Sequence, residues 1–183
     1  KPSQGGIVDH FLALDKASPL PIIMYNVPGR TGSNMSAETT LAIANQSENI
    51  IAIKEASGDM IQGARILKSK PAAFHLLSGD DPTALPLMGL GATGIISVIS
   101  NAFPEEFTSM AHAVLKGDLK QARTIHEQLL DLHPLLYIEG NPTGIKACLN
   151  EMGLCSDEVR LPLKRMSASH RKDLQAILQS ILD

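Results

Sequence analysis

A lysine ends an apolar stretch of this chain. Residues 50–54 read Ile-Ile-Ala-Ile-Lys, and Gly58 and Asp59 then give a turn signal, so the pattern predicts a buried strand of a parallel sheet. Lysine is seldom buried without a partner or a use, and lost hydration favours its neutral amine, which can attack a carbonyl carbon to form a Schiff base. Lys54 is therefore a candidate nucleophile. The alternative is a strand-ending lysine that reaches water or pairs with Glu55 or Asp59.

Two further side chains could assist such an amine. Tyr25 comes late in the apolar stretch at residues 22–26, where a phenol could relay protons to and from a bound substrate. Its alternative is a core tyrosine whose hydroxyl has one partner. Arg30, in the loop at residues 28–32, could hold a substrate carboxylate through two parallel hydrogen bonds, or could be a solvated loop arginine.

Other site chemistries have less support. The six histidines are scattered, with no HExxH motif or paired spacing, so no metal site is expected. Asp80 and Asp81 are adjacent carboxylates, but Asp81 precedes Pro82 and is interpreted as the cap of a helix that starts there. Ser78 has no nucleophile-elbow context, which argues against a serine hydrolase.

The composition is that of an ordinary globular protein. The 183 residues are 44% hydrophobic and 19% charged, with a formal net charge of −3. Nucleic acid is not an expected partner because no basic stripe is present. A membrane is not expected either, because no apolar run approaches the roughly 18 residues that span a bilayer. Cys148 and Cys155 show no disulfide or metal spacing, which predicts reduced thiols and a cytoplasmic location. Lys1 opens a loop-like segment that does not resemble a signal peptide, as if the chain began within a domain.

The spacing of apolar stretches predicts repeated βα units. The predicted strands begin near positions 22, 50, 74 and 95, and helical patterns fill the intervals. Such units require parallel strands with right-handed crossovers. After about position 118 only helical patterns remain. The main predicted helices lie at residues 7–16, 36–46, 60–69, after 104, after 118, after 142 and near the C-terminus, and the fourth strand at 95–100.

The predicted fold class is α/β. Four βα units could form a small open sheet or half of a (β/α)8 TIM barrel, and no GxGxxG motif supports a dinucleotide-binding sheet. In a barrel, catalytic side chains lie at the carboxyl ends of the strands, where Tyr25 and Lys54 are predicted. The preferred division is a barrel half at residues 1–117 and a helical region at 118–183.

Five segments in order resemble the dihydrodipicolinate synthase family, which belongs to the pyruvate-dependent Schiff-base aldolases that also include N-acetylneuraminate lyase. The resemblance runs from Lys1 to the C-terminal helix and implies that the chain is the C-terminal part of a TIM-barrel enzyme. The segments are residues 25–32 (YNVPGRTG), 53–59 (IKEASGD), 77–81 (LSGDD), 94–98 (GIISV) and 139–142 (EGNP).

This resemblance implies roles for five residues. Lys54 would form the imine with pyruvate, and Tyr25 would relay protons. Arg30 would bind the carboxylate of aspartate semialdehyde, while Gly79 and Ile96 would line the pyruvate pocket, Ile96 through its backbone carbonyl. The implied product is 4-hydroxy-tetrahydrodipicolinate, in lysine and diaminopimelate biosynthesis, made without a cofactor other than the covalent imine. The implied assembly is a homotetramer, a dimer of dimers.

The family pattern is not complete in these residues. A Gly-Thr-Thr segment that binds the pyruvate carboxylate, and a second tyrosine that precedes the Lys1 segment, are not in the sequence. Two alternatives therefore stay open. One is another aldolase of the superfamily, an N-acetylneuraminate lyase or a 2-keto-3-deoxy sugar-acid aldolase. The other is a non-catalytic barrel half that acts only with a partner chain.

Overall fold

The computed structural model describes residues 1–182 and contains two compact units, Lys1–Ile96 and Ser97–Asp183. All four strands lie in the first unit, and the second is helical. The division predicted between residues 117 and 118 marks where the barrel half would end along the chain. It stays a prediction.

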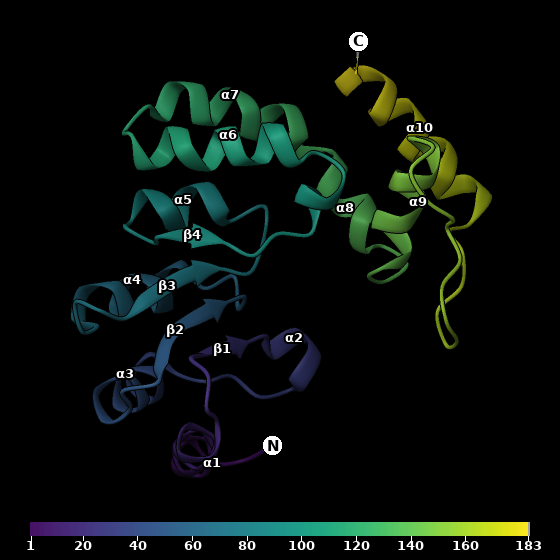
Figure 1. Cartoon of the computed structure of the whole chain (residues 1–183). Helices are drawn as coiled ribbons and strands as arrows, with labels where there is room; N and C mark the ends of the chain where they lie inside the picture. The colour runs from purple at the N-terminus through teal and green to yellow at the C-terminus, as the bar shows by residue number, and fades with distance from the viewer. Residues whose placement is uncertain (183) are drawn as a thin grey trace. The chain divides into compact units, whose positions relative to one another are not determined.

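The first unit is built on a parallel sheet, as predicted (Figure 1). Its strands have the order β1-β2-β3-β4, so each strand pairs with the next one along the chain. This order follows from the short helical connections, since each crossover returns the chain beside the strand it has just left. The strands are β1 (Ile22–Asn26), β2 (Ile50–Glu55), β3 (His75–Ser78) and β4 (Gly94–Ile95).

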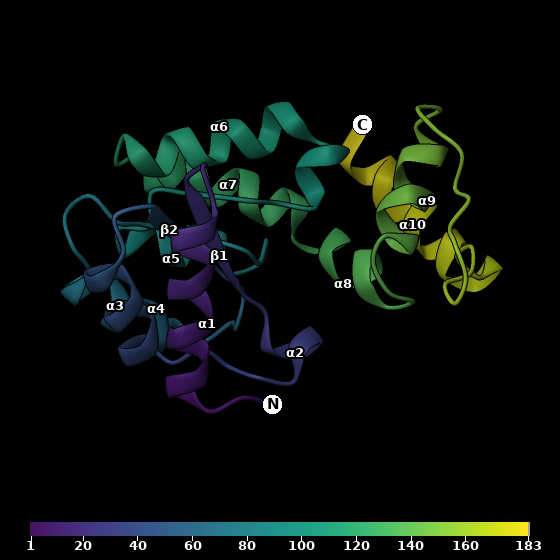
Figure 2. The ribbon, with the colours of Figure 1, turned by 60° about the horizontal axis from the view of Figure 1, so that its bottom comes forward.

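The longer helices of the first unit pack against one another in the order in which they occur along the chain. Contacts join α1 to α3, α3 to α4, and α4 to α5, and Figure 2 shows α3 beside α1. Side-chain caps fix three helix starts: Ser3 accepts from Gly6 N, Ser36 from Thr39 N, and Asp59 from Ile61 N and Gln62 N. These helices are α1 (Gln4–Ala17), α2 (Pro28–Thr31), α3 (Ala37–Gln46), α4 (Met60–Ser69) and α5 (Ala84–Gly89).

The buried core of the sheet follows its register. Met24, Ile53 and Leu76 are register partners on β1, β2 and β3, and each is at most 1% exposed. Partners in a parallel sheet point to the same face, and successive residues alternate between faces. The next residues along, Tyr25 and Lys54, therefore project from the opposite face.

Three local predictions differ from the structure. Pro28 does not simply end β1 in a loop, because it occupies the first turn of the short helix α2. Asp81 is not a helix cap: it is buried, and α5 begins only after Thr83. The strand predicted at 95–100 ends at Ile95. Its continuation is a 3-10 turn, because the Ser97 hydroxyl accepts from Ser100 N and competes with strand pairing.

The second unit consists of consecutive helices. Figure 1 shows α6 and α7 side by side, and α8 contacts α9 and α10. The Asp118 side chain accepts a hydrogen bond from Gln121 N and caps α7, in the region where a helix was predicted. In residues 1–182 no helix combines the length and apolar character needed to cross a bilayer. The helices are α6 (Pro104–Leu115), α7 (Leu119–Leu130), α8 (Leu132–Tyr137), α9 (Thr143–Glu151) and α10 (Ala168–Leu182), after the 3-10 turn η1 (Ile99–Asn101).

Ion pairs tie α9 and the segment after it to α10. The Arg171 guanidinium donates to Glu151 and to Asp157, with 2.7 Å between Nη1 and the Asp157 carboxylate. Hydrogen bonds from Arg171 hold the pKa of Asp157 below its usual value of 3.8. Hydrogen bonds from Gln175 and Arg171 likewise lower the pKa of Glu151 from its usual value of 4.5. The deprotonated carboxylates are therefore the forms that the folded unit favours.

These lowered pKa values predict a loss of stability in acid. Carboxyl groups with folded pKa values below the unfolded ones contribute above the unfolded pKa, and that contribution is lost as pH falls through the folded values. Urea unfolding followed by circular dichroism from about pH 7 to about pH 3 should show this fall. Asp157→Asn should reduce the dependence of the unfolding free energy on pH, whereas Asp173→Asn, an exposed control, should leave it unchanged. An unchanged acid profile in Asp157→Asn would contradict the assignment.

Candidate active site

Tyr25 and Lys54 form a cross-strand pair near the carboxyl ends of β1 and β2. They are register partners, and the Lys54 Nζ lies 4.2 Å from the centroid of the Tyr25 ring. An ammonium at this distance is attracted to the ring face. Tyr25 is 45% exposed and Lys54 is half-buried, so a small molecule can approach the amine from the side of the phenol. The structure therefore brings together the two side chains predicted to act on a substrate.

Lys54 does not form either of the ion pairs considered as alternatives. Glu55 points to the opposite face of the sheet, where Asn26 and Gln62 donate to its carboxylate. Asp59 is occupied as the cap of α4. Across residues 1–182, Lys54 has no carboxylate within salt-bridge distance. Its amine is thus available on the open face.

Gly79 leaves room for the lysine side chain. It directly follows β3, and its N–H donates to the Glu55 carbonyl oxygen at 2.7 Å. A Cβ built on Gly79 would lie 2.8 Å from Lys54 Cγ and 2.8 Å from Ala56 Cβ. Real Cβ atoms almost never approach other atoms so closely. Gly79 therefore permits the observed path of the Lys54 stem.

Ile96 and Arg30 also follow carboxyl ends of strands. Ile96 comes directly after β4, its N–H donates to the Ser78 carbonyl oxygen at 2.9 Å, and it is 40% exposed. Arg30 is exposed in α2, which follows β1 (Figure 1). Carboxyl ends of parallel strands share one edge of a sheet, so all five predicted residues belong to that edge. Within the described chain, no contact links the Arg30 side chain to Lys54.

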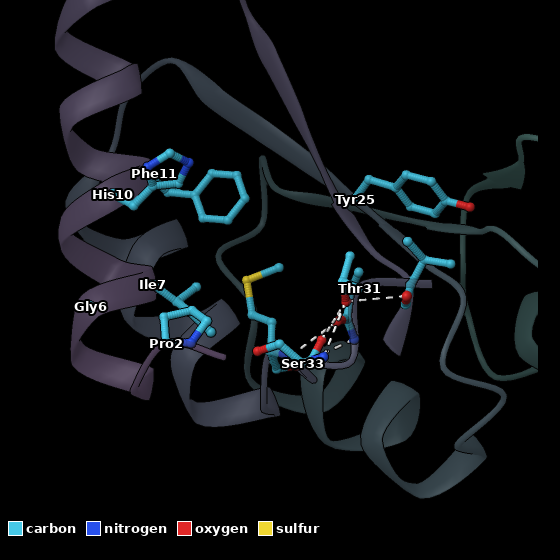
Figure 3. A pocket seen from close by; sticks show the side chains of 11 residues that line it. Pro2, Gly6, Ile7, His10, Phe11, Tyr25, Thr31 and Ser33 are labelled. Atoms are coloured by element: carbon cyan, nitrogen blue, oxygen red, sulfur yellow. Dashed lines mark hydrogen bonds between the residues drawn. The ribbon is translucent and has the colours of Figure 1, made fainter. Parts of the chain in front are cut away.

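A pocket of about 470 Å³ lies between α1 and β1. Figure 3 shows His10 and Phe11 of α1 on one side of it and Tyr25 on the other. Thr31 Oγ1 donates to the Ser33 carbonyl oxygen at 2.9 Å and orders the chain that closes one end. Among residues 1–182, no three His, Cys, Asp or Glu side chains are grouped so that they could bind a metal ion.

Glu55 was not among the predicted site residues. It was considered only as a partner of Lys54, yet it is 3% exposed and anchors a hydrogen-bond network on the far face. Strand alternation could have placed the Glu55 side chain on the face opposite to Lys54, although its hydrogen-bond partners come from other segments.

Comparison with known proteins identifies the family. The family model of the dihydrodipicolinate synthetase family matches residues 1–181. The chain belongs to this family. The similarity agrees with the order of the five sequence segments and with the parallel α/β architecture.

Individual relatives cover nearly all of this chain. The 4-hydroxy-tetrahydrodipicolinate synthase of Phocaeicola vulgatus is 51% identical over 181 residues, which are 99% of this chain and 61% of the relative. That of Parabacteroides distasonis is 55% identical over 163 residues, 89% of this chain and 55% of the relative. The crystal structure of dihydrodipicolinate synthase from Aquifex aeolicus superposes with a TM-score of 0.94 at 41% identity, covering 98% of this chain and 61% of that one.

The chain thus spans less than two thirds of the length of these relatives. Assignment of the chain to the C-terminal part of the family's fold stays a prediction from the motifs.

Replacing Gly79 tests how tightly Lys54 is held. Gly79→Ala should cost about 1–3 kcal/mol in the free energy of unfolding, because the new methyl group displaces Lys54 or Ala56. Gly89→Ala is the matched control, since a Cβ there would meet no atom within 4 Å. Urea unfolding of both variants measures the difference. Equal stability of the two would show that Gly79 is not crowded.

Proposed function

We propose that this chain carries the nucleophile of a Schiff-base lyase that condenses pyruvate with L-aspartate 4-semialdehyde to give 4-hydroxy-tetrahydrodipicolinate, in lysine and diaminopimelate biosynthesis. One observation carries the proposal: the Lys54 amine has no carboxylate partner in residues 1–182 and lies 4.2 Å from the Tyr25 ring on the open face of the sheet. Membership of the dihydrodipicolinate synthetase family supports the choice of substrates.

The proposed reaction starts at the amine. Neutral Lys54 adds to the ketone carbon of pyruvate, and the ketone oxygen leaves as water to give an imine. Loss of a proton from the pyruvate methyl group gives an enamine, whose carbon adds to the aldehyde carbon of the second substrate. Tyr25 is proposed to carry the protons that these steps release and consume, since a phenol can both donate and accept. The amino group of the aspartate semialdehyde portion then adds to the imine carbon, which closes the ring and releases the Lys54 amine.

Three other residues have proposed binding roles. Arg30 would hold the carboxylate of the aldehyde substrate through a bidentate pair. Gly79 and Ile96 would line the pyruvate pocket, the latter with its backbone carbonyl. No cofactor beyond the covalent imine is proposed.

We propose that the natural protein has the length of these relatives and forms a (β/α)8 barrel, of which this chain supplies four βα units. The support is that β1 pairs only with β2 among the described strands, so its other edge is unpaired. An edge of this kind is normally paired or covered. Further strands of the barrel would cover this edge and the pocket beside it. Homotetrameric assembly is proposed from the family resemblance.

Trapping of the imine tests the nucleophile. Pyruvate followed by borohydride should add one reduced pyruvyl group to the natural protein, and peptide mapping should locate it on Lys54. Lys54→Arg should abolish the adduct because a guanidinium stays protonated. Lys68→Arg, on an exposed turn of α4, serves as the control and should be labelled as before. An adduct on another lysine would contradict the assignment.

Replacement of Arg30 tests the second substrate. Arg30→Ala should leave pyruvate trapping intact and raise KM for aspartate semialdehyde by about 10-fold to 100-fold, because the charge-assisted pair between the guanidinium and the substrate carboxylate is lost. Arg65→Ala is the control, an exposed arginine of the same unit. Steady-state kinetics measure the effect. An unchanged KM would favour an aldolase for sugar acids instead.

A further inference from the structure

Glu55 is a buried carboxylate that directly follows the lysine. It is 3% exposed, and its oxygens accept hydrogen bonds from Asn26 Nδ2 at 3.1 and 3.0 Å, Gln62 Nε2 at 2.9 Å and Ser57 N at 2.7 Å. All these donors are uncharged, and no cation pairs with Glu55 among residues 1–182. Burial of a carboxylate is costly even when it is hydrogen-bonded. An apolar side chain would avoid that cost, so we looked for an effect of the Glu55 carboxylate other than filling the core.

The network joins segments that are distant in the sequence. Asn26 ends β1, Glu55 ends β2, and Gln62 lies in the first turn of α4. One carboxylate therefore fixes the spacing of two strand ends and their distance from a helix. The backbone reinforces this arrangement, since Ala56 N donates to the Asn26 carbonyl oxygen at 2.9 Å.

The same network closes the base of the loop that bears Arg30. The loop leaves β1 at Asn26 and returns at Met35, whose N–H donates to Asn26 Oδ1 at 3.0 Å. Gln62 Nε2 donates to the Met35 carbonyl oxygen at 3.2 Å, and Asn34 Nδ2 donates to Gln62 Oε1 at 2.9 Å. Both ends of the Arg30 loop are thus held by groups that also bind Glu55.

Register places this network directly behind the candidate site. Asn26 pairs with Glu55, and the preceding pair is Tyr25 with Lys54. Because adjacent residues of a strand point to opposite faces, the two pairs share two peptide units but lie on different sides. A shift of Glu55 against Asn26 must therefore shift Lys54 against Tyr25.

We propose that Glu55 is a positioning residue: through Asn26 and Gln62 it sets the relative position of Lys54, Tyr25 and the Arg30 loop. The proposal rests on the function proposed above. It assigns to Glu55 no contact with substrate and no proton transfer. Its effect on the reaction comes from the geometry of the opposite face.

Two variants weaken the network in different ways. Glu55→Gln keeps the shape but turns one acceptor into a donor, which then faces the N–H of Gln62 or of Ser57. Gln62→Met removes one donor from Glu55 and leaves its bonds to Asn26 and Ser57. The controls are Glu48→Gln and Gln46→Met, at exposed positions of the same unit.

The test separates positioning from stability in the natural protein. Circular dichroism gives the folded fraction, and the rate constant for pyruvate trapping on Lys54 is expressed per folded molecule. Both variants should lower this rate constant by about 10-fold or more, because a small misplacement of reacting groups has effects of this size. They should also raise KM for aspartate semialdehyde, through the Arg30 loop. The controls should match the wild type in both measurements.

Two results would overturn the proposal in distinguishable ways. If the wild type is trapped on Lys54 and both variants react at the wild-type rate per folded molecule, Glu55 only stabilises the fold. If the wild type forms no adduct on Lys54, the proposed function fails and the positioning role fails with it. Should Glu55→Gln not fold, Gln62→Met decides between positioning and stability.

Discussion

The register between β1 and β2 is the constraint on which the candidate site depends. It pairs Tyr25 with Lys54 and, one residue on, Asn26 with Glu55. In a strand the side-chain period is two, so a slip by one residue would exchange the two faces. The amine would then meet the helices and the carboxylate would meet the open face. The chemistry proposed for this chain requires the register that the core and the polar network enforce together.

Core packing and site geometry are therefore linked. Met24 and Ile53, the partners preceding the site, are buried against the helical side of the sheet. Glu55 continues that side with hydrogen bonds instead of apolar contacts. On the other face, Gly79 lets the neighbouring backbone approach the Lys54 stem. The partly exposed Lys54 is thus positioned by strand register and by packing of its stem rather than by an ion pair.

The sequence predicted much of this arrangement because its signals are local. Apolar stretches located β1, β3 and all of β2 except its last residue, and the tyrosine and lysine late in the first two strands indicated the candidate pair. The helix starts near Ser36 and Asp118 are local in the same way, because each of these side chains accepts a hydrogen bond from a backbone N–H three residues further on. Predictions failed where a tertiary environment decided the outcome: Asp81 is buried rather than at a cap, and β4 is cut short by the bond between Ser97 and Ser100. The network around Glu55 depends on residues from three segments, so no single stretch could reveal it.

A crystal structure of the full-length protein, treated with pyruvate and then with borohydride to reduce the imine, would show directly whether Lys54 is the nucleophile. We expect a pyruvyl group on Lys54 Nζ, on the same face as Tyr25, with the phenol oxygen within hydrogen-bond distance of the adduct. Glu55 should still hold Asn26 and Gln62 on the other face. An adduct on a different lysine, or a modified Lys54 turned away from Tyr25, would contradict the roles proposed for these two residues.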